Sequence, residues 1–417
     1  MSTIFCLQRF VTRGSFFCWV RQRASSIKHI QLDFDAWCRQ YYQGAFSAVQ
    51  ASRSVATLLE ILRASLQQLK VQDTSYVVNA TMLRSLALAK NLQHLQLFGV
   101  SSHVLVSDAL KQITCLSQLK NLELADSEDH RQIIQQQHPS FFPTQLCNLP
   151  SLITLHIQSP LVTYIDPAIT AFSNLQTLVI NGSSLEEVST VLVELKQLHI
   201  LCLADNASLA LSKAPDEWWP QELTGLKSLT QLDLSSCGVG GVPVSLGKLA
   251  HLSFLDLGAN SAAPGIMLPV DLGSCSAMRA LRLNDCILRR IPRCLCKLLA
   301  MEYLGLANNQ LTELPQALTS LSNLRDLDLA HNDFQTFPTL LAGLTSLARI
   351  SFKGCTDLQI IEPLPMLTSL CKLTALIFTC DLTRHEPRWS ADSTSNLISL
   401  ALGFVTVNGR DAKVLRL

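Results

Sequence analysis

A short apolar motif recurs along the chain from about residue 80 onward. Two neighbouring blocks show it most clearly: residues 304–324 read LGLANNQLTELPQALTSLSNL, and residues 324–347 read LRDLDLAHNDFQTFPTLLAGLTSL. Both fit L-x-x-L-x-L-x-x-(N/C)-x-L once the first block is extended back to Met301. The alternating leucines predict one short strand per repeat, with leucines pointing inward and their neighbours pointing outward.

The first apolar position of this motif recurs at intervals, and 23 residues is the commonest step. It falls at Leu92, Leu119, Leu152, Leu175, Leu198, Leu229, Leu252, Met278, Met301, Leu324, Leu347, Leu373 and Leu397. A single repeat cannot bury its apolar face alone, so we expect about 13 stacked repeats over residues 81–403. The first boundary stays open, because Leu83 also begins a fitting block.

Two further positions of the repeat carry a physical signal. The ninth position is Asn or Cys, short side chains that can bond to buried backbone groups where the chain leaves the strand. This predicted turn ladder consists of Asn206, Cys237, Asn260, Cys286, Asn309, Asn332 and Cys355. On the return side an apolar residue precedes proline, as in Leu314-Pro315 and Trp219-Pro220. Trp219 is therefore predicted to be a core residue, whereas Trp218 is left open.

This 23-residue unit with its Leu-Pro step resembles the intracellular leucine-rich-repeat proteins of the Ras-suppressor and Scribble-like type. The resemblance covers about residues 80–403 and is most specific from 229 to 347. It implies a right-handed α/β solenoid with a curved parallel sheet on the concave face and a helical or irregular convex side. Such proteins bind other proteins, and the resemblance brings no catalytic residues.

The ends of the repeat array need covering, since an open core is unfavourable. Residues 33–80 predict a helical N-terminal cap, because Val55, Leu58, Leu59, Leu62, Leu66 and Leu69 follow three- and four-residue spacing. An independent pair of protein-docking helices is the alternative. Residues 404–417 predict a C-terminal cap, in which Asn408-Gly409 favours a hairpin turn.

Residues 1–32 contain five basic residues and no acidic residue. Wound as a helix, this segment places Ile4, Leu7 and Val11 opposite Arg9 and Arg13, the profile of a mitochondrial targeting leader. A partly disordered N-terminus is the other interpretation. The expected location is therefore mitochondrial, with the cytoplasm as the alternative.

Composition narrows the function classes. The formal net charge is +1 and charged residues make up 16% of the chain, which argues against a general binder of nucleic acid. No run of 18 apolar residues exists, so no membrane span is expected. The 14 cysteines do not form the paired blocks of a secreted disulfide framework, so a reducing compartment is favoured.

The sequence contains no motif for catalysis. We find no glycine-rich phosphate loop, His-Glu-x-x-His motif or nucleophile elbow, and therefore expect no enzyme activity, catalytic residue or cofactor. Cys294-Leu295-Cys296 lacks a second pair of ligands, so no metal site is expected, and its two thiols are assigned to the surface or a turn.

The outward strand positions are the candidate binding surface. They include Asp205, Asp233, Phe254, Asp256, Arg279, Arg282, Tyr303, Arg325, Asp326, Asp328 and His331. Aromatic residues among charges suit a protein-binding hot spot, although a solvated sheet face that keeps the solenoid soluble would carry similar charges. The polar insertion at residues 127–141 is a second candidate contact.

Three functional hypotheses follow. The first is a non-catalytic scaffold or adaptor that binds one or a few protein partners through its concave face. The second is a structural subunit or assembly factor of a large mitochondrial complex, including a ribonucleoprotein. The third is an unrecognised enzyme, which would need an activity that survives changes on the concave face.

Overall fold

The computed structural model describes residues 13–33, 48–72, 78–100, 104–105, 107–126, 142–261, 265–358, 370–379, 401–407 and 410–416. The chain divides into two compact units, Met1–Asn206 and Ala207–Leu417. The polar insertion at 127–141 lies outside the described residues. Within the described part, no helix is long and apolar enough to cross a bilayer.

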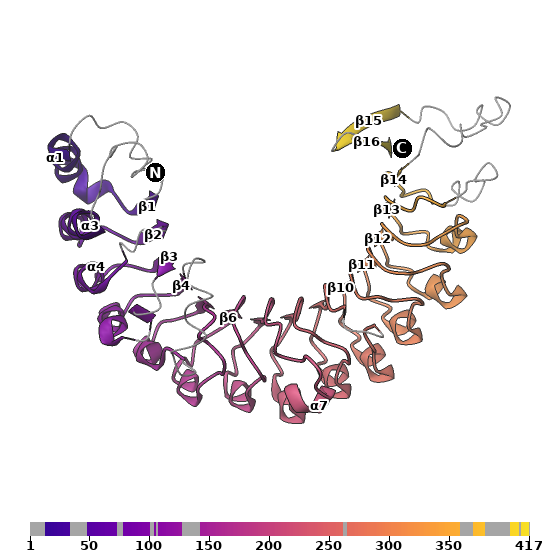
Figure 1. Cartoon of the computed structure of the whole chain (residues 1–417), viewed down its shortest axis with the longest axis horizontal. Coiled ribbons are helices and arrows are strands. Elements are labelled where there is room, and N and C mark those ends of the chain that lie inside the picture. Colours follow the sequence, from indigo (N-terminus) through magenta and orange to yellow (C-terminus); the bar gives the residue numbers. More distant parts are fainter. Residues whose placement is uncertain are drawn as a thin grey trace. The chain divides into compact units, whose positions relative to one another are not determined.

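Unit 1 is built from successive helix–strand coils (Figure 1). Its strands are β1 (His29–Asp33), β2 (Gln68–Gln72), β3 (His94–Val100), β4 (Asn121–Asp126), β5 (Thr154–Gln158), β6 (Thr177–Ile180) and β7 (Ile200–Cys202). Its α-helices and 3₁₀ helices (η) are α1 (Arg13–Arg23), η2 (Ala24–Ser26), α3 (Ala48–Leu62), α4 (Ala80–Leu86), η3 (Asp108–Cys115), η5 (Thr144–Asn148), η6 (Pro167–Ala171) and η7 (Thr190–Glu194). Each strand pairs in parallel with the next one along the chain.

The coils of unit 1 begin earlier than the repeat pattern suggested. Val55, Leu58, Leu59 and Leu62 lie on α3 as the spacing predicts, but Leu69 lies on β2. Residues 33–80 therefore contribute a strand as well as helices, and β1 begins at His29, inside the expected leader. The three- and four-residue spacing of leucines on α3 continues through Leu66 to Leu69 on β2 by coincidence. The buried leucines of the helix and of the strand that follows it face the same core.

The structure also resolves where the repeat pattern begins. Leu95 and Leu97 are both buried on β3, so the block that starts at Leu92 is the repeat. Leu83 and Leu86 instead lie on α4, where Asn79 caps the helix by accepting from the backbone N–H groups of Thr81 and Met82.

Unit 2 repeats the same coil with shorter strands and 3₁₀ return segments. Its strands are β8 (Gln231–Asp233), β9 (Phe254–Asp256), β10 (Ala280–Arg282), β11 (Tyr303–Gly305), β12 (Asp326–Asp328), β13 (Arg349–Phe352), β14 (Ala375–Thr379), β15 (Ala401–Val407) and β16 (Arg410–Arg416). Its helices are α7 (Pro215–Trp218), η8 (Gln221–Gly225), η9 (Val244–Lys248), η10 (Val270–Ser274), η11 (Arg293–Lys297), η12 (Gln316–Ser320) and η13 (Thr339–Gly343).

In unit 2, β8–β14 pair in parallel and the strands and helices lie on opposite sides (Figure 1). β16 then pairs antiparallel with both β14 and β15, and Val407 lies opposite Arg410. The hairpin turn predicted at Asn408 and Gly409 lies outside the described residues.

The prolines of the return side begin 3₁₀ helices. Pro243, Pro292 and Pro315 are N-caps of η9, η11 and η12, where a missing N–H costs nothing. Trp219, which precedes one of these prolines, is fully buried. Trp218 is fully buried too, and the two rings meet edge to face with their centroids 5.9 Å apart.

Candidate functional site

The outward side chains of unit 2 form rows across its parallel strands, because the strands pair without a shift. One row runs through Gln231, Phe254, Ala280, Tyr303, Asp326 and Arg349. A second row, two residues further along each strand, runs through Asp233, Asp256, Arg282, Gly305, Asp328 and Ser351. We call the surface made by these two rows, with the residue that precedes each strand, the unit-2 face.

Arg282 is the centre of the unit-2 face. Its guanidinium carbon lies 5.3 Å from the ring centroid of Phe254 and 5.8 Å from that of Tyr303, on the two neighbouring strands. Ala280 separates these rings in the row and leaves room for the guanidinium between them. Nη1 also donates to Asp256 Oδ2 at 3.1 Å. The arginine is thus fixed by two aromatic faces and one carboxylate.

Tyr303 depends on a glycine for its position. A Cβ atom at Gly305 would lie 3.1 Å from the Tyr303 hydroxyl oxygen and 2.9 Å from Asn284 Oδ1. Both are closer than normal van der Waals contact, and Asn284 is held because its Oδ1 accepts from the Ala307 N–H. The absence of a side chain at Gly305 therefore lets the Tyr303 ring lie along its own strand.

The ionisation states of this cluster follow from its surroundings. Burial acts to lower the pKa of Arg282, but the hydrogen bond and charge of Asp256 outweigh it and raise the pKa above the usual arginine value. Burial, followed by the charge of Asp328, raises the pKa of Tyr303. The cluster therefore presents a permanent cation and a neutral hydroxyl at neutral pH.

Further ion pairs link neighbouring coils along the same face. Glu302 Oε1 lies 2.9 Å from Arg279 Nη1, and Glu302 Oε2 lies 3.8 Å from Arg325 Nη1. In the next coil, Arg349 Nη2 donates to Asp326 Oδ2 at 2.8 Å. One carboxylate therefore bridges two arginines, and a second pair continues the line.

In each of these pairs the cation is the more exposed partner. Side-chain exposure is 69% for Arg279 against 34% for Glu302, 47% for Arg282 against 11% for Asp256, and 68% for Arg349 against 20% for Asp326. The carboxylates lie closer to the backbone while the guanidinium groups extend above them. An approaching molecule therefore meets positive charge first, although the charges of the face are nearly balanced.

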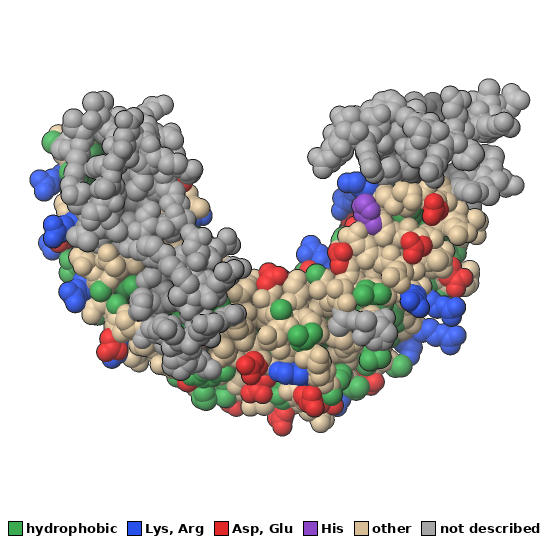
Figure 2. All heavy atoms as spheres, viewed as in Figure 1, with side chains coloured by type: hydrophobic (Ala, Val, Ile, Leu, Met, Phe, Trp, Pro, Cys, Tyr) green, Lys and Arg blue, Asp and Glu red, His purple; other side chains and the backbone are tan. Residues whose placement is uncertain are grey.

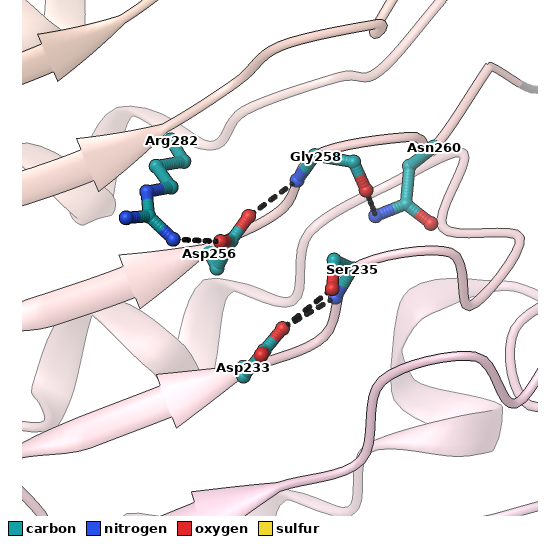
Figure 3. Close-up of polar contacts among 6 residues, drawn as sticks. All are labelled: Asp233, Ser235, Asp256, Gly258, Asn260 and Arg282. Atoms are coloured by element: carbon teal, nitrogen blue, oxygen red, sulfur yellow. Dashed lines mark hydrogen bonds and ion pairs between the residues drawn. The ribbon is translucent and has the colours of Figure 1, made fainter. Parts of the chain in front are cut away.

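The aspartates of the second row also hold the turns that follow their strands (Figure 3). Asp233 Oδ1 accepts from the Ser235 N–H at 3.0 Å and from its hydroxyl at 2.7 Å. Asp256 Oδ1 accepts from the Gly258 N–H at 2.9 Å, and Asp328 Oδ1 accepts from the Ala330 N–H at 3.1 Å. Charge reversal at these aspartates would therefore disturb the fold as well as the surface.

Below the turns, the asparagines of the ninth position bond to backbone groups of their own coil and of the preceding coil. Asn260 Nδ2 donates to the carbonyl oxygens of Leu234 (2.9 Å) and Leu257 (2.8 Å), and its Oδ1 accepts from the N–H groups of Cys237 (3.0 Å) and Val239 (2.9 Å). Equivalent bonds are made by Asn206 in unit 1 and by Asn309 and Asn332 in unit 2.

The cysteines of this position make fewer bonds than the asparagines. The Cys286 thiol donates to the carbonyl oxygen of Leu257 at 3.1 Å, and the Cys355 thiol donates to that of Leu329 at 3.3 Å. Cys237 reaches Ser235 O at 3.4 Å. Burial raises the pKa of Cys286 to about 12, so this thiol stays protonated at neutral pH. Its surroundings are those of a structural cysteine and not of a reactive one.

Comparison with known proteins agrees with this geometry. A family model described as a leucine-rich repeat region matches residues 257–384. The chain has the leucine-rich-repeat fold. No curated protein sequence matches the chain. The intracellular 23-residue class suggested by the sequence therefore stays a prediction.

Solved structures with the leucine-rich-repeat fold resemble most of this chain. A leucine-rich-repeat protein of Leptospira interrogans is 18% identical with a TM-score of 0.51, covering 89% of this chain and 99% of its own. An internalin of Listeria monocytogenes is 16% identical with a TM-score of 0.51, covering 75% and 80%. A TDR receptor is 18% identical with a TM-score of 0.53, and this chain spans 58% of it. These likenesses support the fold, and leucine-rich-repeat domains commonly bind proteins.

Most sequence-predicted binding residues lie together on the unit-2 face of the leucine-rich-repeat array. Asp205 does not belong to this face, because it lies in unit 1. Asp205 and His331 occupy the eighth repeat position, where φ is positive in coil after coil, as at Ser236, Ala259 and Asn308. Their backbone conformation thus belongs to the turn, although both side chains are exposed.

Two members of the face, Glu302 and Arg349, were missing from the sequence-based set. Glu302 occupies the second position of its repeat and Arg349 the third, so the outward pattern already contained the signal for both. The role of Gly305 gave no sequence signal, because it depends on where the Tyr303 ring lies.

The cysteine pair on η11 differs from its prediction. Cys294 and Cys296 are both buried, whereas the sequence assigned them to the surface or a turn. The η11 segment is a 3₁₀ helix enclosed by neighbouring coils, so residues on both sides of Leu295 are covered. Among the described residues, no group of three or more His, Cys, Asp or Glu side chains could hold a metal ion.

Unit 1 carries a separate polar contact on its strands. Glu123 on β4 accepts from Gln96 Nε2 at 2.6 Å and lies 2.9 Å from His156 Nδ1. The hydrogen bond with His156 lowers the pKa of Glu123 in spite of partial burial. His156 is therefore the partner of a carboxylate.

Proposed function

We propose that this chain is a non-catalytic scaffold or adaptor that binds an acidic protein surface with its unit-2 face. The observation that carries the proposal is Arg282, fixed between Phe254 and Tyr303 while nearly half of its side chain is exposed. Arginine and aromatic side chains that are already ordered lose little entropy on binding and dominate protein–protein hot spots.

The charge arrangement supports an acidic partner. Arg279, Arg282 and Arg325 extend beyond the carboxylates that pair with them. Carboxylates of a partner can approach these cations from solvent, while the bound carboxylates keep the arginines in place. A basic partner would have to displace the arginines before it reached Glu302 or Asp256.

Quantitative affinity purification of the full chain from its native source tests this proposal. We expect Tyr303→Ala, and separately the pair Arg279→Ala and Arg325→Ala, to lose the proteins that the unaltered chain retains. Arg84→Ala, an exposed arginine on α4, is the matched control and should retain them. Equal recovery with the face variants, while circular dichroism shows an unchanged fold, would refute the proposal.

A mitochondrial complex is the second candidate, because residues 1–32 are basic and free of acidic residues. In this proposal the chain is a structural subunit or assembly factor of a large particle. Ile30 and Leu32 are buried and β1 pairs with β2, so a removable leader would have to end before His29, where β1 begins.

Two measurements distinguish this second candidate. A reporter fused to residues 1–32 should enter mitochondria, whereas a cytosolic reporter would remove its basis. Stoichiometric, salt-resistant recovery in one large particle favours a subunit, and a salt-sensitive partner favours the adaptor.

A further inference from the structure

A second surface of unit 2 lies away from the unit-2 face, on the loops and 3₁₀ helices that follow the strands. Its exposed apolar side chains come from three consecutive coils: Leu211, Val244, Met267 and Val270. Few large apolar side chains are exposed among the described residues of this chain, and these four lie on adjacent coils. We call this surface the edge patch.

Backbone contacts make the edge patch continuous. Gly241 forms a parallel bridge with Met267, and a Cβ atom at Gly241 would lie 3.0 Å from Pro215 Cγ and 4.0 Å from Met267 Cε. In the same way, a Cβ atom at Gly238 would lie 3.3 Å from Leu211 Cβ. Gly238 and Gly241, which have no side chains, therefore lie directly against the apolar side chains of the neighbouring coils.

Charges of opposite sign border the two ends of the edge patch. The first of the three coils, which holds Leu211, also carries Asp216, Glu217 and Glu222 on α7 and η8, all exposed. At the other end, the coil that follows Met267 and Val270 carries Arg289, Arg290 and Arg293 at and before η11, also exposed. Figure 2 shows hydrophobic side chains on this part of unit 2, between a cluster of Lys and Arg and a group of Asp and Glu.

These bordering charges are available to another molecule. Within the described part of the chain, none of the six forms an ion pair at 4.0 Å or less. Glu217 Oε2 accepts from the Ala214 N–H, and Arg289 donates to Gln310. Lys248 and Asp271 add one exposed charge of each sign to the middle, so the order along the coils remains acidic, apolar, basic.

We propose that the edge patch binds a second copy of this chain in a two-fold symmetric dimer. A two-fold rotation reverses the order of the coils, so it places the acidic end of one copy opposite the basic end of the other. The same rotation apposes the central coils, so that Val244 of one copy faces Met267 and Val270 of its partner. A surface with an apolar centre and opposite charges at its ends is complementary to itself. An acidic or a basic foreign segment would instead meet like charge at one end.

Analytical ultracentrifugation of the full chain tests this proposal. We expect a concentration-dependent dimer, with twice the 45.9 kDa mass of the chain, that the double variant Met267→Glu and Val270→Glu abolishes. Leu299→Glu is the matched control, since Leu299 is exposed to a similar extent outside the edge patch, and this variant should dimerise normally.

Charge exchange makes the test specific to the two-fold arrangement. Arg290→Glu with Arg293→Glu should weaken dimerisation by roughly tenfold or more, because like charges then face each other. Adding Asp216→Arg and Glu222→Arg should restore it to within about threefold, since the charges are exchanged. If the chain stayed monomeric at all concentrations up to roughly 100 μM, the proposal would be overturned, because a dissociation constant above that value is weak even for a transient interface. A dimer that survives Met267→Glu with Val270→Glu, or no recovery on charge exchange, would also overturn it.

Discussion

Replacing Asn260 with alanine should destabilise unit 2 far more than an exposed asparagine can. The change leaves the N–H groups of Cys237 and Val239 and the carbonyl oxygens of Leu234 and Leu257 without the bonds that Asn260 makes. An unsatisfied buried group costs about 1–3 kcal/mol, so the two N–H groups alone imply a loss of about 2–6 kcal/mol. Asn260 itself is fully buried, so solvent does not replace these bonds in the intact fold.

Urea denaturation followed by tryptophan fluorescence can measure this loss, because Trp218 and Trp219 are buried in the same unit. Hydrogen exchange locates it, since the amides of Cys237 and Val239 should lose protection before those of distant coils. Asn323→Ala is the control, because Asn323 makes one exposed bond to Leu299 O and should cost less than about 1 kcal/mol. Equal losses for Asn260→Ala and Asn323→Ala would refute the importance of the buried asparagines.

Three further predictions concern the turns, the thiols and the first coil. Ala259 has a φ of 55°, so Ala259→Gly should raise the free energy of unfolding by about 0.5–1 kcal/mol, and an unchanged or lower urea midpoint would contradict this. Burial raises the pKa of the Cys286 thiol from 9.0 to about 12. The contribution of the protonated thiol to the free energy of unfolding is therefore complete below pH 9 and should fall by about 1.4 kcal/mol per pH unit toward pH 12. Cys286→Ala should make the free energy of unfolding from urea titrations fall less steeply over this pH range. Deleting residues 1–33 removes the buried Ile30 and Leu32 of β1 and should lower the melting temperature sharply, and an unchanged melting temperature would contradict this.

The repeat architecture could be predicted from sequence because the same pattern of apolar and polar positions recurs in each repeat. The alternation around Leu304 and Leu327 placed the strands, and the ninth-position Asn and Cys residues marked the turns. β1 and β2 could not be placed in this way, because their segments HIQLD and QLKVQ lack the full leucine motif. They are defined by pairing instead, β2 with β3 and β1 with β2.

The candidate site was only partly predictable for a different reason. Sequence position shows which side chains point outward, and this placed Phe254, Arg282 and Tyr303 on one surface. It does not show which carboxylates turn back to the backbone, as Asp233 and Asp256 do. Nor does it show relative exposure, which makes a nearly neutral set of charges cationic at its outer surface.

Hydrogen-exchange mass spectrometry on the full chain, with and without its purified protein partner, tests the proposed binding face most directly. We expect slower exchange in the peptides of β9, β10, β11 and β12 on binding, and loss of this protection with Tyr303→Ala. Protection confined to other segments, with β9–β12 exchanging at the same rate in the free and bound chain, would contradict it.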